Sequence, residues 1–168
     1  MKKVLLLIIT LLLITGCKSE KIYLSDKYYN EGNYISVKNL DGLEKDTYVI
    51  YTYNYYCSFK IPCEKVFKEY MEKYKIDFIS MPFEYFKQTP FYKKVKFGPS
   101  VVIIKEGKII AYLDADKDED LEKYQDSKKF EEWINNYIYT EGSNWSFFLT
   151  FIFKNVSILW QKVEQVWH

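Results

Sequence analysis

The sequence contains no arginine, and its single histidine is the last residue, His168. Arginine recognises phosphate and guanine through paired hydrogen bonds, and the 24 lysines here are matched by 23 acidic residues. The composition therefore does not indicate nucleic-acid binding. Histidine-activated nucleophiles and most zinc sites need histidines within the chain, and a phosphate loop needs clustered glycines, whereas the six glycines are scattered. Hydrolase, kinase and metalloenzyme functions are disfavoured.

The first of only three cysteines follows a segment typical of an export signal. Met1-Lys2-Lys3 is basic, and the apolar run at residues 4–14 is shorter than the about 20 residues of a membrane span. Ile14-Thr15-Gly16-Cys17 resembles the lipobox of bacterial lipoproteins, in which a peptidase cuts before a cysteine that carries lipid. We therefore predict a signal peptide at residues 1–16 and a lipidated Cys17, on the extracytoplasmic face of the cell membrane. An uncleaved anchor helix and a soluble secreted form remain open.

Cys57 and Cys63 are then the only cysteines that can pair within the processed chain. They lie between a strand-like run at residues 47–54 and a helix-like run at residues 64–74, and Pro62 directly precedes the second cysteine. The positive end of a helix stabilises a thiolate, which is the reactive form of cysteine. Outside the cytosol such a pair is usually a structural bridge or a redox site, and the spacing leaves both open, as well as two unpaired thiols.

Hydrophobic periodicity predicts one α/β domain at residues 34–140, preceded by a polar tether at residues 17–33 that holds the domain off the membrane. Strands are expected at residues 34–38, 47–53, 76–81, 100–105 and 108–113, and helices at residues 64–74, at residues 83–88 and from Asp126 or Ser127 onward. Residues 91–97 return the chain to the sheet, Glu106-Gly107 is a hairpin signal, and the charged run at residues 114–122 is expected to be a solvated loop. This order predicts a mixed sheet with helices on both faces.

Two blocks of the sequence resemble the thioredoxin superfamily. Residues 48–57 resemble the family's strand that leads into an aromatic residue and the nucleophilic cysteine, and residues 97–110 resemble its proline, strand, glycine turn and strand. The resemblance implies a thioredoxin-like α/β fold, with Cys57 and Cys63 as the catalytic pair and Pro99 as a cis-proline across from them. The groove for the substrate chain would be formed by Pro99, Gly98, Tyr56 and Pro62. The subgroup that the chain resembles is the thioredoxin-like lipoproteins and bacteriocin-transport accessory proteins of Gram-positive bacteria.

Three positions depart from the family's pattern. Five residues separate Cys57 from Cys63 where the family has two, Tyr51 stands at the position of a buried aspartate, and Tyr56 stands at that of a tryptophan. Because of Tyr51, no carboxylate is evident to take the proton of the second thiol.

The longer spacing also constrains the backbone between the cysteines. A disulfide needs Cα atoms about 4.4–6.8 Å apart, which a helix starting directly after Cys57 would prevent. A loop at residues 58–61 and a helix from Pro62 would allow closure, with roughly 2–2.5 kcal/mol of stabilisation for so small a ring. Cys63, at the helix terminus, would then be the more acidic thiol, and Lys60 would either add a positive charge nearby or stay solvated.

Residues 141–168 extend beyond the resemblance. The run at residues 145–160 is almost wholly apolar, is interrupted by Lys154 and Asn155, and is short for a membrane span. A helix in the membrane interface beside the lipid anchor is one expectation. Packing on the domain or on a partner is the other.

Two functions follow from these observations. The first is a membrane-anchored thiol–disulfide oxidoreductase that acts on exported proteins and is recycled by a membrane redox partner. The second is a non-catalytic binding or accessory module in peptide or bacteriocin export, with the two cysteines as a structural disulfide. Neither function requires a cofactor or involves nucleic acid.

Overall fold

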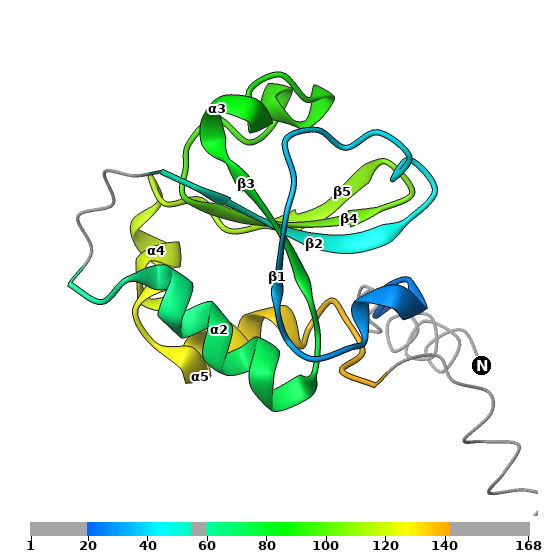
Figure 1. Cartoon of the computed structure of the whole chain (residues 1–168). Coiled ribbons are helices and arrows are strands. Elements are labelled where there is room, and N and C mark those ends of the chain that lie inside the picture. The colour runs from blue at the N-terminus through cyan, green and yellow to red at the C-terminus, as the bar shows by residue number, and fades with distance from the viewer. Residues whose placement is uncertain (1–19, 55–59, 142–168) are drawn as a thin grey trace, which may run out of the picture.

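The computed structural model describes residues 20–54 and 60–141 of the chain (Figure 1). Within these residues, five strands form one mixed sheet in the order β1-β3-β2-β4-β5. The strands are β1 (Tyr34–Ser36), β2 (Thr47–Tyr53), β3 (Phe78–Pro82), β4 (Ser100–Lys105) and β5 (Lys108–Tyr112). β1 and β2 pair with β3 in parallel, whereas β4 is antiparallel to both β2 and β5. The mixed sheet predicted from the sequence is confirmed.

Helices cover both faces of this sheet. Figure 1 shows α2 (Cys63–Tyr74), α4 (Asp118–Leu121) and α5 (Ser127–Ile134) on one side, and α3 (Phe83–Phe86) on the other. Short 3-10 helices are η1 (Asp26–Tyr28), η2 (Pro90–Lys93) and η3 (Glu122–Tyr124). The segment expected at residues 91–97 to lead back to the sheet therefore begins in η2 and continues to β4.

The central strands explain the continuous apolar runs of the sequence. Six of the seven residues of β2 and five of the six of β4 are buried, as expected for strands with helices on both faces. Helix α2 buries one apolar face against the sheet, and its ring of Phe67 lies 4.5 Å from that of Phe130 on α5. Burial of large aromatic side chains supplies much of the driving force for folding in such a layer.

The hairpin between β4 and β5 forms as its turn residues require. Glu106 has φ 47° and Gly107 has φ 73°, the two positive angles of the tight turn that joins twisted antiparallel strands. The hairpin predicted at Glu106-Gly107 is confirmed.

The predicted tether at residues 17–33 needs correction over its described part, residues 20–33. Ile22, Leu24 and Tyr28 are buried in the core, Ile22 forms a bridge with Ile138, and Tyr29 forms one with Ile76. Three well-spaced apolar side chains in a polar segment are enough to fasten it to the domain, although they produce no regular periodicity. The folded unit therefore starts before residue 34.

The charged run at residues 114–122 is solvated only in part: residues 116–119 and 122 are exposed, as predicted, but the rest departs from the prediction. It contains α4, and Asp114 and Asp120 are both only 9% exposed. The Asp120 carboxylate accepts the backbone N–H of Asp114 at 3.0 Å and forms an ion pair with Lys123 at 2.6 Å. Local partners offset the cost of burying these charges.

The predicted signal peptide at residues 1–16, the predicted lipidation site Cys17, the pair Tyr56 and Cys57, and the extension beyond residue 141 lie outside the described residues. Within the described part of the chain, every helix is too short or too polar to cross a membrane.

Candidate functional site

Cys63 is the first residue of α2, and its side chain is buried, with 2% of its surface exposed. The exposed Pro62 precedes it as the N-cap, and the Pro62 carbonyl accepts the backbone N–H of Lys65 at 2.9 Å. Proline suits this place because the first turn of a helix leaves its N–H groups without intrahelical partners. The helix starts one residue after the predicted start at Pro62, and this places the thiol of Cys63 at the positive end of α2.

Tyr51 lies directly behind Cys63. Its hydroxyl oxygen is 3.3 Å from the Cys63 sulfur, a hydrogen bond in which either atom can be the donor. The Tyr51 ring is held by Phe67, at 5.3 Å between ring centroids, and by Tyr34, at 5.7 Å. The position that carries an aspartate in the resembling family is therefore a buried tyrosine in contact with the sulfur.

The chemistry of Tyr51 differs from that of a carboxylate. Burial, followed by the neighbouring Cys63, raises the pKa of Tyr51 far above the ordinary value for tyrosine. The hydroxyl therefore keeps its proton at neutral pH, where it can donate to a thiolate but cannot take up the proton of a thiol.

Pro99 follows a cis peptide bond with Gly98, as the resemblance implied. Pro99 is buried, and its carbonyl accepts a hydrogen bond of 3.0 Å from the hydroxyl of Tyr124. Burial raises the pKa of Tyr124 well above the usual value, and the nearby Cys63 is among the charges that raise it further. The Tyr124 ring also lies 5.7 Å from that of Phe67 on α2, so Tyr124 connects the loop of Pro99 with the helix that begins at Cys63.

Gln125 fastens the chain just before Cys63. Its side-chain oxygen accepts the backbone N–H of Ile61 at 3.1 Å, and its side-chain nitrogen donates to the Ile61 carbonyl at 2.8 Å. The consecutive residues Tyr124 and Gln125 therefore hold both segments of the site, the one around Pro99 and the one that leads into α2. No sequence motif pointed to either residue.

Gly98 is placed where a side chain would not fit. A Cβ added to it would lie 2.7 Å from two atoms of the Phe83 ring. Phe83 is the first residue of α3, so the loop of Pro99 packs closely on this helix. Gly98 itself is half-buried, and Phe97, which directly precedes it, is 48% exposed.

The structure therefore brings together part of the predicted site. Cys63, Pro62, Gly98 and Pro99 occupy the two segments that Tyr124 and Gln125 link. Lys60 is exposed. Within residues 20–54 and 60–141, His, Cys, Asp and Glu form no group of three that could hold a metal ion.

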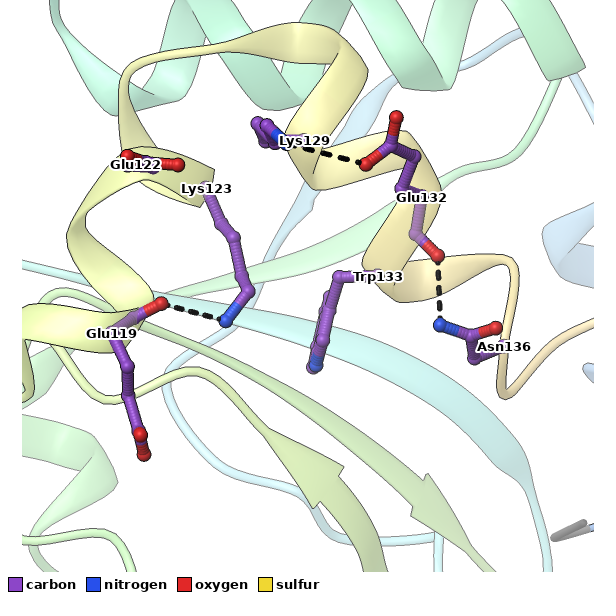
Figure 2. Close-up of a pocket in the computed structure, with 7 residues that line it drawn as sticks. All are labelled: Glu119, Glu122, Lys123, Lys129, Glu132, Trp133 and Asn136. Atoms are coloured by element: carbon purple, nitrogen blue, oxygen red, sulfur yellow. Dashed lines mark hydrogen bonds and ion pairs between the residues drawn. The ribbon is translucent and has the colours of Figure 1, made fainter.

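Figure 2 shows a separate open hollow formed by α4, η3 and α5. Its lining residues are Glu119, Glu122, Lys123, Lys129, Glu132, Trp133 and Asn136. The lysines of the hollow have partners within it: the Lys123 ammonium donates to the backbone carbonyl of Glu119 at 2.9 Å, and the Lys129 ammonium lies 3.7 Å from the Glu132 carboxylate. None of the lining residues is among the predicted site residues.

No known family profile and no curated protein matches this chain. The solved structures to which it is similar include three thioredoxins. One from Schistosoma mansoni has 19% identity and a TM-score of 0.45, covering 65% of this chain and 99% of that one. A mutant thioredoxin from Halobacterium salinarum has 15% identity and a TM-score of 0.48, covering 66% and 95%. A thioredoxin from Nicotiana alata has 18% identity and a TM-score of 0.39, covering 64% and 94%.

The fold is thioredoxin-like. Its strand order, the helices on both faces and the cis-proline before β4 establish this from the chain itself. The predicted thioredoxin-like fold is confirmed. Because a fold hosts many functions, the activity has to be argued from the site.

Proposed function

We propose that this protein is a membrane-anchored, extracytoplasmic thiol–disulfide oxidoreductase that acts on exported proteins through Cys57 and Cys63. The observation that carries the proposal is the position of Cys63, which is buried at the first residue of α2 with Tyr51 against its sulfur. A helix terminus and a hydrogen-bond donor both favour a thiolate over a thiol.

The burial of Cys63 supports different steps for the two cysteines in this proposal. The Cys57 thiolate attacks one sulfur of a substrate disulfide, and the other substrate sulfur leaves as a thiolate. The Cys63 thiolate then attacks the Cys57 sulfur, which releases the second substrate sulfur and leaves a Cys57–Cys63 disulfide. The substrate gains two electrons and the pair loses two, and a membrane redox partner restores the dithiol.

The surroundings of Cys63 suit an extended peptide as substrate. Ile61, two residues before Cys63, is 40% exposed, and Phe97, two residues before Pro99, is 48% exposed. Exposed apolar side chains of this kind supply contact area for another chain. Tyr124 and Gln125 hold the two segments that carry them in fixed positions.

The proposed location follows from the N-terminal sequence. Lipid on Cys17 would hold the domain at the extracytoplasmic face of the cell membrane, where exported proteins form and exchange disulfides. Residues 145–160 would add a second contact with the membrane. Membership of the thioredoxin-like lipoproteins or bacteriocin-transport accessory proteins belongs to the same proposal.

A second function is favoured by one observation. Cys63 is almost fully buried, and the residue two before it is bonded to Gln125 through both its N–H and its carbonyl. A rigid, inaccessible cysteine suits a structural disulfide. The protein would then be a binding or accessory module in peptide or bacteriocin export.

Trapping of mixed disulfides separates these functions. With an unfolded disulfide protein as substrate, Cys63→Ser should accumulate a covalent complex through Cys57, because the resolving thiol is missing. Cys57→Ser is the matched control and should trap nothing, and both variants should lose insulin reduction. An intact protein that neither reduces insulin nor yields a complex in Cys63→Ser would contradict the oxidoreductase.

A further inference from the structure

The two ends of the described chain are bonded to each other. The backbone N–H of Ile22 donates to the Tyr137 carbonyl at 2.8 Å, and the N–H of Tyr139 donates to the Ile22 carbonyl at 3.0 Å. The hydroxyl of Tyr29 donates to the Tyr139 carbonyl at 3.0 Å and accepts the N–H of Leu24 at 3.1 Å. We refer to residues 20–24 with residues 137–141 as the terminal clasp. Both terminal segments leave the domain from this one place.

The terminal clasp lies at the opposite end of the domain from Cys63. Cys63 begins α2, whereas Tyr29, which binds the clasp, forms a bridge with Ile76 just after α2 ends. Twelve helical residues separate the two ends of α2 by about 17 Å. Figure 1 shows the blue N-terminal segment and the orange end of the chain together on the right, while α2 begins on the left.

The terminal clasp also shortens the link to the proposed lipid. Only five residue steps separate Cys17 from Ile22, which is held in the domain, and a fully extended chain covers at most about 18 Å in five steps. A tether reaching to residue 34, as the sequence suggested, would span up to about 60 Å. A lipid on Cys17 therefore keeps the clasp end of the domain at the membrane surface.

The face around the terminal clasp suits that surface. The exposed rings of Tyr23 and Tyr139 are stacked, with 4.3 Å between their centroids, and the Lys21 ammonium lies 5.9 Å from the Tyr139 centroid. Tyrosine side chains gather at membrane–water interfaces because the ring is apolar and the hydroxyl is polar. The Lys21 stem can lie along this apolar surface with its ammonium at the headgroups, but Glu20 and Glu141 are also exposed in the clasp, so the contact is assigned to the tyrosine rings and not to net charge.

We propose that the domain rests on the membrane through Lys21, Tyr23 and Tyr139, so that Cys63 faces away from the bilayer. This inference rests on the lipidation of Cys17 in the proposed function. It means that substrates reach the cysteine pair from the aqueous side, and that the membrane-facing end takes no part in the exchange.

Photo-crosslinking from the lipid headgroups tests this orientation. The lipidated full-length chain is placed in vesicles of phosphatidylcholine and phosphatidylglycerol that contain a lipid with a photoactivatable headgroup, and labelled peptides are identified by mass spectrometry. We expect labelling at residues 21–23 and 137–139 and none at residues 60–65. The double variant Tyr23→Ser/Tyr139→Ser should lose most of this labelling, whereas Tyr85→Ser, another exposed tyrosine, should keep it.

A longer link between Cys17 and the domain provides a second test of the orientation. Twelve glycine and serine residues added between Ser19 and Glu20 should lower the labelling, because the lipid on Cys17 then no longer holds the clasp at the surface, and only the proposed contact at residues 145–160 would retain part of it. Equal labelling of residues 60–65, or labelling unchanged by the insertion and the double variant, would overturn the proposed orientation. An unmodified Cys17 in the mature chain would overturn the anchor and the orientation together, while insulin reduction reports on the thiol chemistry independently.

Discussion

The hydroxyl oxygen of Tyr51 lies 3.3 Å from the sulfur of Cys63, and both side chains are buried. This contact joins the middle strand of the sheet to the first residue of α2. A tyrosine that keeps its proton at this position can donate to a Cys63 thiolate but cannot take up the proton of the thiol. The five-residue spacing between the cysteines thus occurs together with a neutral tyrosine, in place of a carboxylate, behind the second cysteine.

Tyr51→Phe should raise the pKa of Cys63. The variant keeps the ring contacts with Phe67 and Tyr34 and removes only the hydroxyl. A hydrogen bond to a charged group contributes about 1.5–3 kcal/mol, which corresponds to a shift of about 1–2 pH units. The measurement is the rate of alkylation of Cys63 against pH in the Cys57→Ser background.

Tyr48→Phe is the matched control for that measurement. Tyr48 is a buried tyrosine on the same strand, and its odd spacing from Tyr51 places it on the other face of the sheet. The pKa of Cys63 should be the same in this control as in the parent. An equal value in Tyr51→Phe as well would show that the hydroxyl does not stabilise the thiolate.

Tyr124→Phe should destabilise the fold. It removes the donor to the Pro99 carbonyl and leaves that buried oxygen without its partner, at a cost of about 1–3 kcal/mol. The ring contact with Phe67 is kept, so the loss reports on the hydrogen bonds of the hydroxyl, which are made to the Pro99 carbonyl and to the Ser100 side chain. Urea unfolding measures the change, and Tyr85→Phe, at an exposed position, should leave the midpoint where it was. An unchanged midpoint in Tyr124→Phe would argue against the link.

Gln125→Ala should loosen the segment before α2. Both backbone bonds of Ile61 to this side chain disappear, so hydrogen exchange at Ile61 should become faster. The effect on global stability should be small because these bonds are exposed. Gln88→Ala changes another exposed glutamine and should leave exchange at Ile61 unaltered. Equal protection of Ile61 in both variants would contradict the role given to Gln125.

Stability should fall in alkaline solution because several tyrosines are buried. Burial raises the pKa values of Tyr51, Tyr70 and Tyr124 in the folded state, whereas unfolded tyrosines titrate near pH 10. Above about pH 10 the unfolded state therefore holds fewer protons and is favoured, by about 1.4 kcal/mol per pH unit for each such tyrosine. Below that pH their contribution is fully present.

Urea unfolding at a series of pH values, with tyrosinate absorbance recorded in parallel, checks this dependence. The contribution of the buried tyrosines to the free energy of unfolding should be constant up to about pH 9 and should fall at higher pH. If every tyrosine of the folded protein titrated together near its ordinary pKa, the account of the buried hydroxyls would be incorrect.

Local signals in the sequence were sufficient for much of the fold. The apolar face of α2, the Glu106-Gly107 turn and the proline before β4 each depend on residues a few positions apart. Periodicity and turn chemistry act over that range, which is why these elements were predicted.

The remaining features depend on contacts between distant residues. Gln125 and Ile61 are 64 positions apart, and Ile22 pairs with residues more than 100 positions away. Such pairs leave no periodic trace, because each partner is an ordinary residue in its own segment. The burial of Asp120 was not predicted for a similar reason. Its hydrogen bond and ion pair offset the cost of burying the carboxylate, whereas composition alone indicated a solvated run.

The reduction potential of the Cys57–Cys63 pair tests the central claim most directly. It is measured by equilibrating the purified full-length protein with glutathione buffers and quantifying the free thiols. An exchange enzyme should give a value within the range of known oxidoreductases, about −270 to −120 mV. A value below about −300 mV would identify a structural disulfide and contradict the proposed thiol–disulfide exchange.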